Sequence, residues 1–97
     1  MPKYKIREKA IEDLESIWLY TLDTWSEKQA NNYYNLIIQE IELIAGNKSI
    51  GVSIQNIRNG YYFSRVKSHV IFYVITDKLE VVRILNQKMD IDNKLKE

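Results

Sequence analysis

Two amphipathic helical patterns, separated by about two residues, constrain the fold of this chain more than any other feature. Apolar side chains recur at three- and four-residue steps from Ala10 to Trp25 and again from Ala30 to Ile44, which is typical of helices with one buried face. Ser26 and Gln29 have the spacing of a capping box that begins a new helix. The sequence therefore predicts an antiparallel hairpin of two helices over residues 8–25 and 27–46. The predicted inward residues are Ala10, Ile11, Leu14, Ile17, Trp18, Leu22 and Trp25 in the first helix and Ala30, Tyr33, Tyr34, Ile37, Ile41 and Ile44 in the second.

The rest of the chain has the pattern of β-strands separated by short turns. The predicted strands are 4–7, 61–66, 69–76 and 79–87, with an extended piece at 54–57. Because the breaks between the last three strands are two-residue turns, these strands form an antiparallel meander. Val70 to Ile75 is apolar on both faces, which indicates a central strand covered on both sides. We predict one domain over 1–97 of the α+β class, with the order β-α-α-β-β-β and the helix hairpin packed on a small, mainly antiparallel sheet.

Composition excludes several classes of protein. With no cysteine and one histidine among 97 residues, the chain has no disulfide framework, no thiol nucleophile and no site with several imidazole ligands. Its apolar runs are far shorter than the ~20 residues of a membrane span, and its N-terminus does not resemble a signal peptide. We therefore expect a cytoplasmic protein with no metal ion, cofactor or membrane contact.

Charge is unevenly distributed between the two halves of the chain. Residues 1–47 carry 5 basic and 8 acidic side chains, whereas residues 48–97 carry 9 basic and 5 acidic ones. The basic half favours an acidic partner, although a pI of 7.9 is below that of a dedicated nucleic-acid-binding domain.

No established catalytic or phosphate-binding motif is present, and the single histidine has two interpretations. His69, near Arg65 and Lys67, is either a general acid for phosphodiester cleavage or a hairpin-end residue hydrogen-bonded to the backbone. We favour the second interpretation. The acidic pairs Glu12/Asp13 and Asp90/Asp92 are expected to be solvated rather than to hold a divalent ion.

Aromatic residues and one strand cation suggest a binding surface. Seven tyrosines exceed what so small a core needs, and surface tyrosine is enriched at protein interfaces. Tyr61 and Tyr62 are neighbours on a strand, so one of them must face away from the helices. Arg83 lies between apolar residues, so it must either emerge at an edge or pair with a carboxylate. Trp18 and Trp25 are expected in the core.

Four motifs, spread over nearly the whole chain, resemble a known family. They are A-x-x-D-L-x-x-I from Ala10, W-x-x-x-Q-A-x-x-Y from Trp25, H-V-I-F-Y from His69 and V-V-R-I-L-x-Q-x-M-D from Val81. Together they resemble the toxin subunit of ParE-type type II toxin–antitoxin systems, within the wider RelE/ParE superfamily. The element order predicted above agrees with this resemblance.

The resemblance implies two alternative functions. RelE-like relatives are ribosome-dependent mRNA endonucleases, whereas ParE-like relatives share the fold and poison DNA gyrase. The central-strand position that is typically Arg in the nuclease branch is Val70 here, and Asn86 stands where many relatives of both branches carry His. Because Asn cannot transfer a proton at neutral pH, the resemblance favours gyrase inhibition without catalysis. The endonuclease alternative would use Arg65, Lys67, His69, Arg83 and Lys88.

The resemblance also implies partners and contact residues. A ParD-like antitoxin would neutralise the toxin, and DNA would be contacted only through the antitoxin or gyrase. The resemblance does not decide between a monomer and a homodimer. The expected target contact is a run of cationic, polar and apolar residues that leaves the sheet edge: Arg83, Gln87, Lys88, Met89 and Asp90. The residues expected to contact the antitoxin are Tyr34, Tyr61, Tyr62 and Arg65. An acidic, amphipathic antitoxin segment is expected in the groove beside the helical pair.

Overall fold

The computed structural model describes residues 3–47, 52–53 and 60–96 and has the predicted α+β architecture. Its elements are β1 (Tyr4–Ile6), α1 (Glu8–Thr24), α2 (Glu27–Gly46), β2 (Val52–Ser53), β3 (Tyr62–Val66), β4 (His69–Ile75), β5 (Leu79–Asn86) and α3 (Ile91–Lys96). The extended piece expected at 54–57 lies outside the described residues. The two long helices and the three-strand meander are confirmed, each within one residue of its predicted ends.

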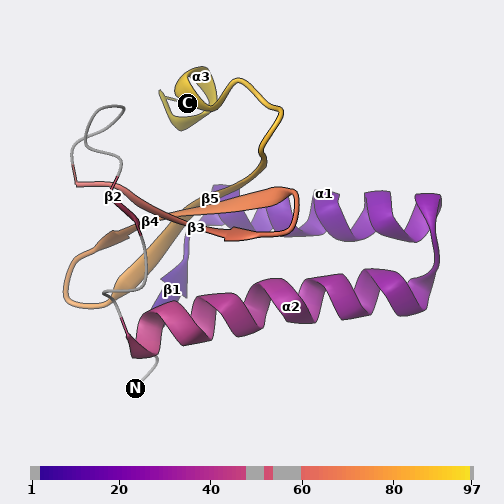
Figure 1. Ribbon diagram of the computed structural model, residues 1–97, viewed down its shortest axis with the longest axis horizontal. Coiled ribbons are helices and arrows are strands. Elements are labelled where there is room, and N and C mark those ends of the chain that lie inside the picture. The colour runs from indigo at the N-terminus through magenta and orange to yellow at the C-terminus, as the bar shows by residue number, and fades with distance from the viewer. Residues whose placement is uncertain (1–2, 48–51, 54–59, 97) are drawn as a thin grey trace.

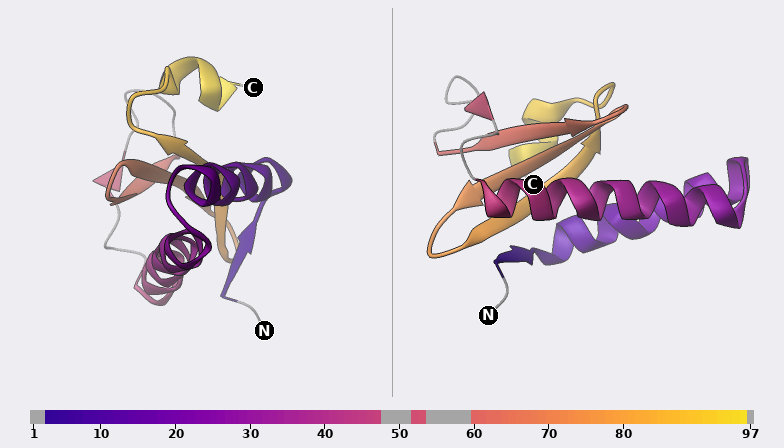
Figure 2. Two further views of the ribbon diagram at one scale, coloured as in Figure 1. Left: turned by 90° about the vertical axis from the view of Figure 1, so that its right-hand side faces the viewer. Right: turned by 60° about the horizontal axis from the view of Figure 1, so that its bottom comes forward.

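The hairpin forms for the reason that the sequence suggested. The Ser26 hydroxyl accepts a hydrogen bond from the Gln29 backbone N–H at 3.1 Å, which caps the first turn of α2. Across the hairpin, the Trp18 indole N–H donates to the Asn31 side-chain oxygen at 2.9 Å. The two helices lie side by side as one antiparallel layer (Figure 2).

The sheet is mixed, with the strand order β1-β5-β4-β3-β2. β3, β4 and β5 pair antiparallel, whereas β1 pairs parallel with the first three residues of β5. A register shift between β4 and β5 occurs at Phe72/Tyr73, where Phe72 pairs with Arg83 and Tyr73 pairs with Val81. β4 is the central strand, as predicted, and β5 is an inner strand rather than an edge.

The two faces of the sheet are covered by different helices. Ile71 and Tyr73 of β4 pack with Ile37 and Ile41 of α2 in the main core. On the other face, Val70 and Phe72 pack in a smaller cluster. This second cluster also contains Leu85, Leu95 and the half-buried Tyr61, Phe63 and Ile91. The C-terminal segment therefore forms a helix that covers a sheet face, an element that the sequence did not predict (Figure 1).

The tip of the hairpin corrects one prediction about the core. Both long helices extend beyond the strands toward the α1–α2 turn (Figures 1 and 2). Trp25 at this turn is 68% exposed, although it continues the apolar stripe of α1. The prediction that Trp25 is a core residue is wrong because the sheet that would cover it ends before the hairpin does. Ile11, 45% exposed, is likewise not buried.

Candidate functional site

Arg83 is held by a buried ion pair that joins three parts of the fold. Its Nε and Nη2 donate to the two carboxylate oxygens of Asp13 at 2.8 and 3.0 Å, a bidentate geometry. Its Nη1 donates to the backbone carbonyl of Lys94 in α3 at 3.1 Å. Asp13 also accepts a hydrogen bond from the Ile84 backbone N–H at 2.9 Å. Ile84 lies after the three residues of β5 that pair with β1. Arg83 therefore ties β5 to α1 and to α3.

This geometry confirms one expectation for Arg83 and corrects two others, one for Arg83 and one for Asp13. Arg83 pairs with a carboxylate, as one sequence-based alternative required. It is only 9% exposed, so the expectation that it leaves the sheet with the target-contacting run is wrong. Asp13 is not solvated, contrary to expectation, because its carboxylate accepts three hydrogen bonds. The only sequence signal for this pairing was a cation between apolar residues of a predicted strand.

The other four residues of the expected target-contacting run lie together on the surface between β5 and α3. Gln87, Lys88, Met89 and Asp90 are all exposed. The Gln87 N–H donates to the Ser68 carbonyl at 2.8 Å, and the Lys88 N–H donates to the Asn86 side chain at 2.9 Å. This segment, residues 87–90, therefore presents its side chains from a defined turn.

His69 is tied to α2 by Tyr33, a contact that sequence reasoning missed. The Tyr33 hydroxyl lies 2.6 Å from His69 Nδ1 and 3.2 Å from the Val66 carbonyl oxygen. Burial lowers the pKa of His69 below its ordinary value and raises the pKa of Tyr33. Within the described part of the chain, the His69 ring contacts side chains and not the backbone expected at the hairpin end: Tyr33 and, at 3.5 Å, Ser68.

The five residues of the endonuclease alternative are not gathered as free groups around one position. His69 and Arg83 line one small hollow of about 180 Å³ together with Asn86, but the Arg83 guanidinium is already held by Asp13. Arg65, Lys67 and Lys88 are exposed outside the lining of this hollow. Among the described residues, no group of His, Asp or Glu side chains is placed to hold a metal ion.

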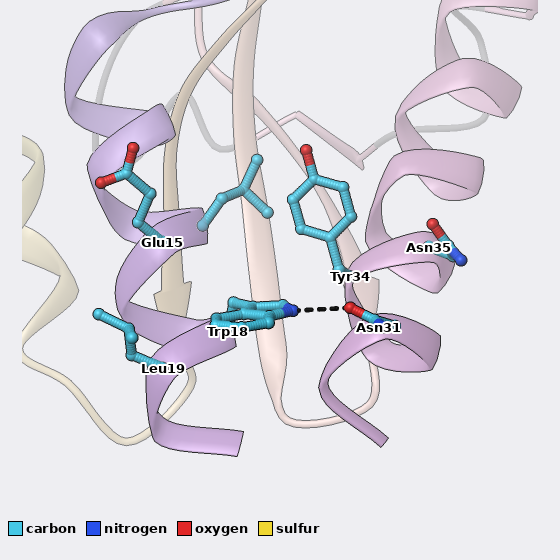
Figure 3. A pocket seen from close by; sticks show the side chains of 7 residues that line it. Glu15, Trp18, Leu19, Asn31, Tyr34 and Asn35 are labelled. Atoms are coloured by element: carbon cyan, nitrogen blue, oxygen red, sulfur yellow. Dashed lines mark hydrogen bonds between the residues drawn. The ribbon is translucent and has the colours of Figure 1, made fainter. Parts of the chain in front are cut away.

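A larger hollow of about 690 Å³ lies on the outer face between α1 and α2. The hydrogen-bonded Trp18 and Asn31 cross its floor, and Tyr34 stands over it from α2 (Figure 3). Glu15 and Leu19 line it on the α1 side, and Asn35 lines it on the α2 side. We call this hollow the hairpin groove. Glu15 is the one carboxylate among the residues that line it.

The four residues expected to contact the antitoxin do not form one patch. Tyr34 lines the hairpin groove and is 40% exposed. Tyr62 packs against the main core, where its ring stacks on Tyr73 at a centroid distance of 5.7 Å. Tyr61 packs against the cluster beneath α3, so one of the two neighbours does face away from the hairpin. Arg65 is exposed on β3.

Comparisons with known proteins agree with this fold and with the sequence motifs. The family described as the ParE toxin of the type II toxin–antitoxin system parDE matches residues 4–91. The chain is 34% identical to Toxin ParE1 of Caulobacter vibrioides over 90 residues, covering 93% of this chain and 94% of that protein. It is 37% identical to Toxin ParE1 of Mycobacterium tuberculosis over 95 residues, covering 96% of this chain and 97% of that protein.

A solved structure shows the same fold at low sequence identity. The chain superimposes on a chain of the chromosomal ParDE toxin–antitoxin system from P. aeruginosa with a TM-score of 0.77 and 15% identity, covering 89% of this chain and 96% of that one. In the described part of the chain, no helix has both the length and the apolar character needed to cross a membrane. The family match and the two relatives establish that this chain belongs to the ParE toxin family of type II toxin–antitoxin systems.

Proposed function

We propose that this toxin arrests growth by binding DNA gyrase and trapping its cleaved-DNA complex, and that a ParD-like antitoxin neutralises it. We choose a binding function over catalysis because the Arg83 guanidinium is already occupied by hydrogen bonds within the fold. It is bidentate to Asp13 and bonded to Lys94, so it is not free to stabilise a phosphate.

The surroundings of His69 support the same choice. Cleavage of RNA through its 2′-hydroxyl needs a group that accepts a proton and a group that donates one. His69 has one ring nitrogen against Tyr33, and Asn86, its partner across the β4–β5 ladder, cannot exchange a proton at neutral pH. A single constrained imidazole is a poor basis for acid–base catalysis.

Residues 87–90 are the proposed contact with gyrase. They offer a cation, an amide, a carboxylate and the 47% exposed Met89 from a turn whose backbone is hydrogen-bonded to the sheet. A rigid turn with mixed side chains suits protein docking because little conformational entropy is lost on binding. Arg83 supports this surface from within the fold and does not touch the target.

The proposed antitoxin rests on family membership and on exposed apolar surface. The matching family is defined by the parDE pair. Leu19, Tyr20 and Leu43 of the two long helices are each more than half exposed, so these apolar side chains are available to a partner. In this proposal, DNA is contacted only through gyrase or the antitoxin.

Induced expression of the toxin in bacteria separates the two functions. We expect growth arrest with a DNA-damage response, inhibition of supercoiling by purified gyrase and intact bulk mRNA. Lys88→Glu should abolish arrest without changing the unfolding transition, because the side chain is exposed. His69→Ala should leave arrest largely intact. Cleaved mRNA in the wild type, lost in a folded His69→Ala variant, would instead support the endonuclease.

A further inference from the structure

We infer that Asn86 is a positioning residue for target binding: its side chain holds the turn of residues 87–90 in the shape in which Lys88 and Met89 meet the target. The role assigned to Asn86 rests on the proposed function, which makes residues 87–90 the contact with gyrase. It adds the residue that fixes the geometry of this contact, and Asn86 acts through the turn rather than by a contact of its own.

Three consecutive backbone N–H groups of this segment are held by acceptors in the fold. The Gln87 N–H donates to the Ser68 carbonyl oxygen at 2.8 Å. The Lys88 N–H donates to Asn86 Oδ1 at 2.9 Å. The Met89 N–H donates to the Asn86 carbonyl oxygen at 3.0 Å. The chain therefore leaves β5 as a turn whose backbone is bonded at each of its first three residues.

Of these three acceptors, only Asn86 Oδ1 belongs to a side chain. Every residue type supplies a carbonyl oxygen, whereas the Lys88 N–H is bonded because position 86 carries a short side chain with an acceptor. A bond from such an oxygen to the N–H two residues later is an Asx turn, which Asn and Asp form readily and Ser forms more weakly. The residue type at position 86 therefore decides whether the turn is closed at Lys88.

The anchor of this turn is part of the sheet. Asn86 is the last residue of β5, lies opposite His69 of β4 in the ladder and is half-buried. Ser68, whose carbonyl accepts the Gln87 N–H, comes immediately before β4. The turn is therefore fastened to the same end of two paired strands.

The far end of the segment is also held. Asp90 Oδ2 accepts a hydrogen bond from Asn93 Nδ2 at 2.6 Å, and the Asp90 carbonyl accepts the Lys94 N–H at 3.0 Å. The Lys94 carbonyl in turn accepts the Arg83 guanidinium at 3.1 Å. Because both ends are fixed, the bond to the Lys88 N–H sets the shape of the turn between them.

A turn that is ordered in the free toxin favours binding. Ordering the backbone of one residue lowers a binding constant by about fivefold to thirtyfold. A segment that already has its bound shape avoids this loss when it meets the target. Loss of the Asx bond should therefore weaken target binding while Lys88 and Met89, the contacting side chains, are still present.

The test compares substitutions of Asn86 that remove the acceptor with substitutions that keep it. Asn86→Leu removes the acceptor at similar size, and Asn86→Gln moves it one methylene further out. Both should raise the toxin concentration that half-inhibits supercoiling by purified gyrase about fivefold to tenfold and weaken growth arrest. Both should also speed hydrogen exchange of the Lys88 amide, measured by NMR, more than about tenfold. Asn86→Asp and Asn86→Ser should stay within about threefold of the wild type in inhibition.

A matched control and a double variant separate positioning from a general loss of structure. Asn32→Leu is the same substitution at an exposed position of α2, on the opposite border of the molecule from α3 (Figure 1). It should change inhibition less than about twofold. Asn86→Leu should have a smaller effect on inhibition in a Lys88→Ala background than in the wild type, because it acts partly through Lys88. A structural defect would instead reduce inhibition equally in both backgrounds and lower the urea midpoint of unfolding.

The contrary results distinguish the role of Asn86 from the proposed target. Asn86 is not a positioning residue if Asn86→Leu leaves either the exchange of the Lys88 amide or the inhibition of gyrase unchanged. The same holds if Asn86→Asp and Asn86→Ser are as weak as Asn86→Leu. In both cases the proposed function stands. Growth arrest by the wild type without inhibition of gyrase would remove the proposed target, and growth arrest by the four Asn86 variants would then decide the positioning role. A wild type that neither arrests growth nor inhibits gyrase would remove both.

Discussion

The two faces of the sheet are covered in very different ways. Toward the hairpin, helices of 17 and 20 residues bury the main core against β4 and β5. On the opposite face, α3 has 6 residues, and Leu95 is the buried side chain among those of this helix whose burial is described. The hairpin face is therefore supported by many apolar contacts, and the α3 face depends on a few.

One residue couples these unequal faces. Arg83 bonds to Asp13 in the hairpin and to the Lys94 carbonyl in α3. Because α3 is shorter than a helix that is stable by itself, its position depends on this bond and on Leu95. Residues 87–90 enter α3 directly, so the proposed gyrase contact is linked to the less stable face.

The largest effect should follow a charge placed in the hairpin face. Ile37 is fully buried in the main core, and Ile37→Asp would bury a carboxylate with no partner and remove apolar packing. We expect a loss of more than about 4 kcal/mol in the free energy of unfolding, enough to abolish a cooperative transition. Urea unfolding followed by circular dichroism measures it. Gln39→Asp, at an exposed position of the same helix, is the control; a cooperative Ile37→Asp variant would mean that the assigned face is wrong.

Breaking the link between the faces should have the next largest effect. Arg83→Met leaves the Asp13 carboxylate largely buried without its ion pair, so we expect a loss of about 3–5 kcal/mol. The double variant Arg83→Met/Asp13→Leu should recover part of this loss because no unpaired charge is left. A single-variant loss below about 1 kcal/mol would contradict the coupling role. For the same reason, Arg83→Glu is expected to unfold the toxin rather than to report on target binding.

Truncating the anchor of α3 tests whether the two faces open separately. Leu95→Ala removes the main buried side chain of this helix, and we expect a loss of about 2–3 kcal/mol. Hydrogen exchange should show faster exchange in α3 and unchanged exchange in α1 and α2. Equal acceleration in all three helices would show a single cooperative unit. Asp92→Ala, at an exposed position of α3, is the control. Deletion after Lys88 would uncover the same cluster, so it cannot be a neutral way to remove the tail.

The contrast between the hairpin face and the α3 face also explains why the sequence predicted the hairpin and not α3. The hairpin has two full apolar stripes and a capping serine, so local pattern was sufficient to place both helices. α3 has only Ile91 and Leu95 on its apolar side, which is too short a pattern to distinguish from a polar tail. Its position depends on an apolar face of β4 and β5 that belongs to a distant part of the chain.

The candidate sites were harder to predict because they depend on contacts between distant residues. Asp13 and Arg83 are 70 residues apart, and Tyr33 and His69 are 36 apart. No local period indicates such pairs. Trp25 was misplaced for a related reason, since a helical stripe does not reveal where the sheet beneath it ends. Residues 87–90 were placed correctly at the surface because three of the four are polar and they follow a strand.

A smaller, pH-dependent effect is expected where α2 meets the β3–β4 turn. Burial lowers the pKa of His69 from the ordinary 6.5, so below pH 6.5 the unfolded state binds more protons than the folded state. Stability is therefore fully present above this pH and falls as the pH drops through the folded pKa. Urea unfolding across this range should show that decline, and His69→Gln should flatten it. Tyr33→Phe should cost about 1 kcal/mol at neutral pH because it removes the hydrogen bond. A stability that rises on acidification would contradict the direction of the shift.

The smallest expected effect concerns the turn between β3 and β4, which belongs to neither face of the sheet. Lys67 has a φ of +52°, in the left-handed region that a side chain bearing a Cβ adopts at a cost. Lys67→Gly relieves that strain but increases the entropy of the unfolded chain, so we expect a net gain of about 0.5–1 kcal/mol. Lys78→Gly, in the β4–β5 turn where φ is not positive, should instead lose stability. The Lys67→Gly gain should slow exchange of β3 and β4 amides without changing the difference between the hairpin and α3. If the gain appears only in α3, the turn must act through residues 87–90, whose Gln87 N–H bonds to the neighbouring Ser68 carbonyl.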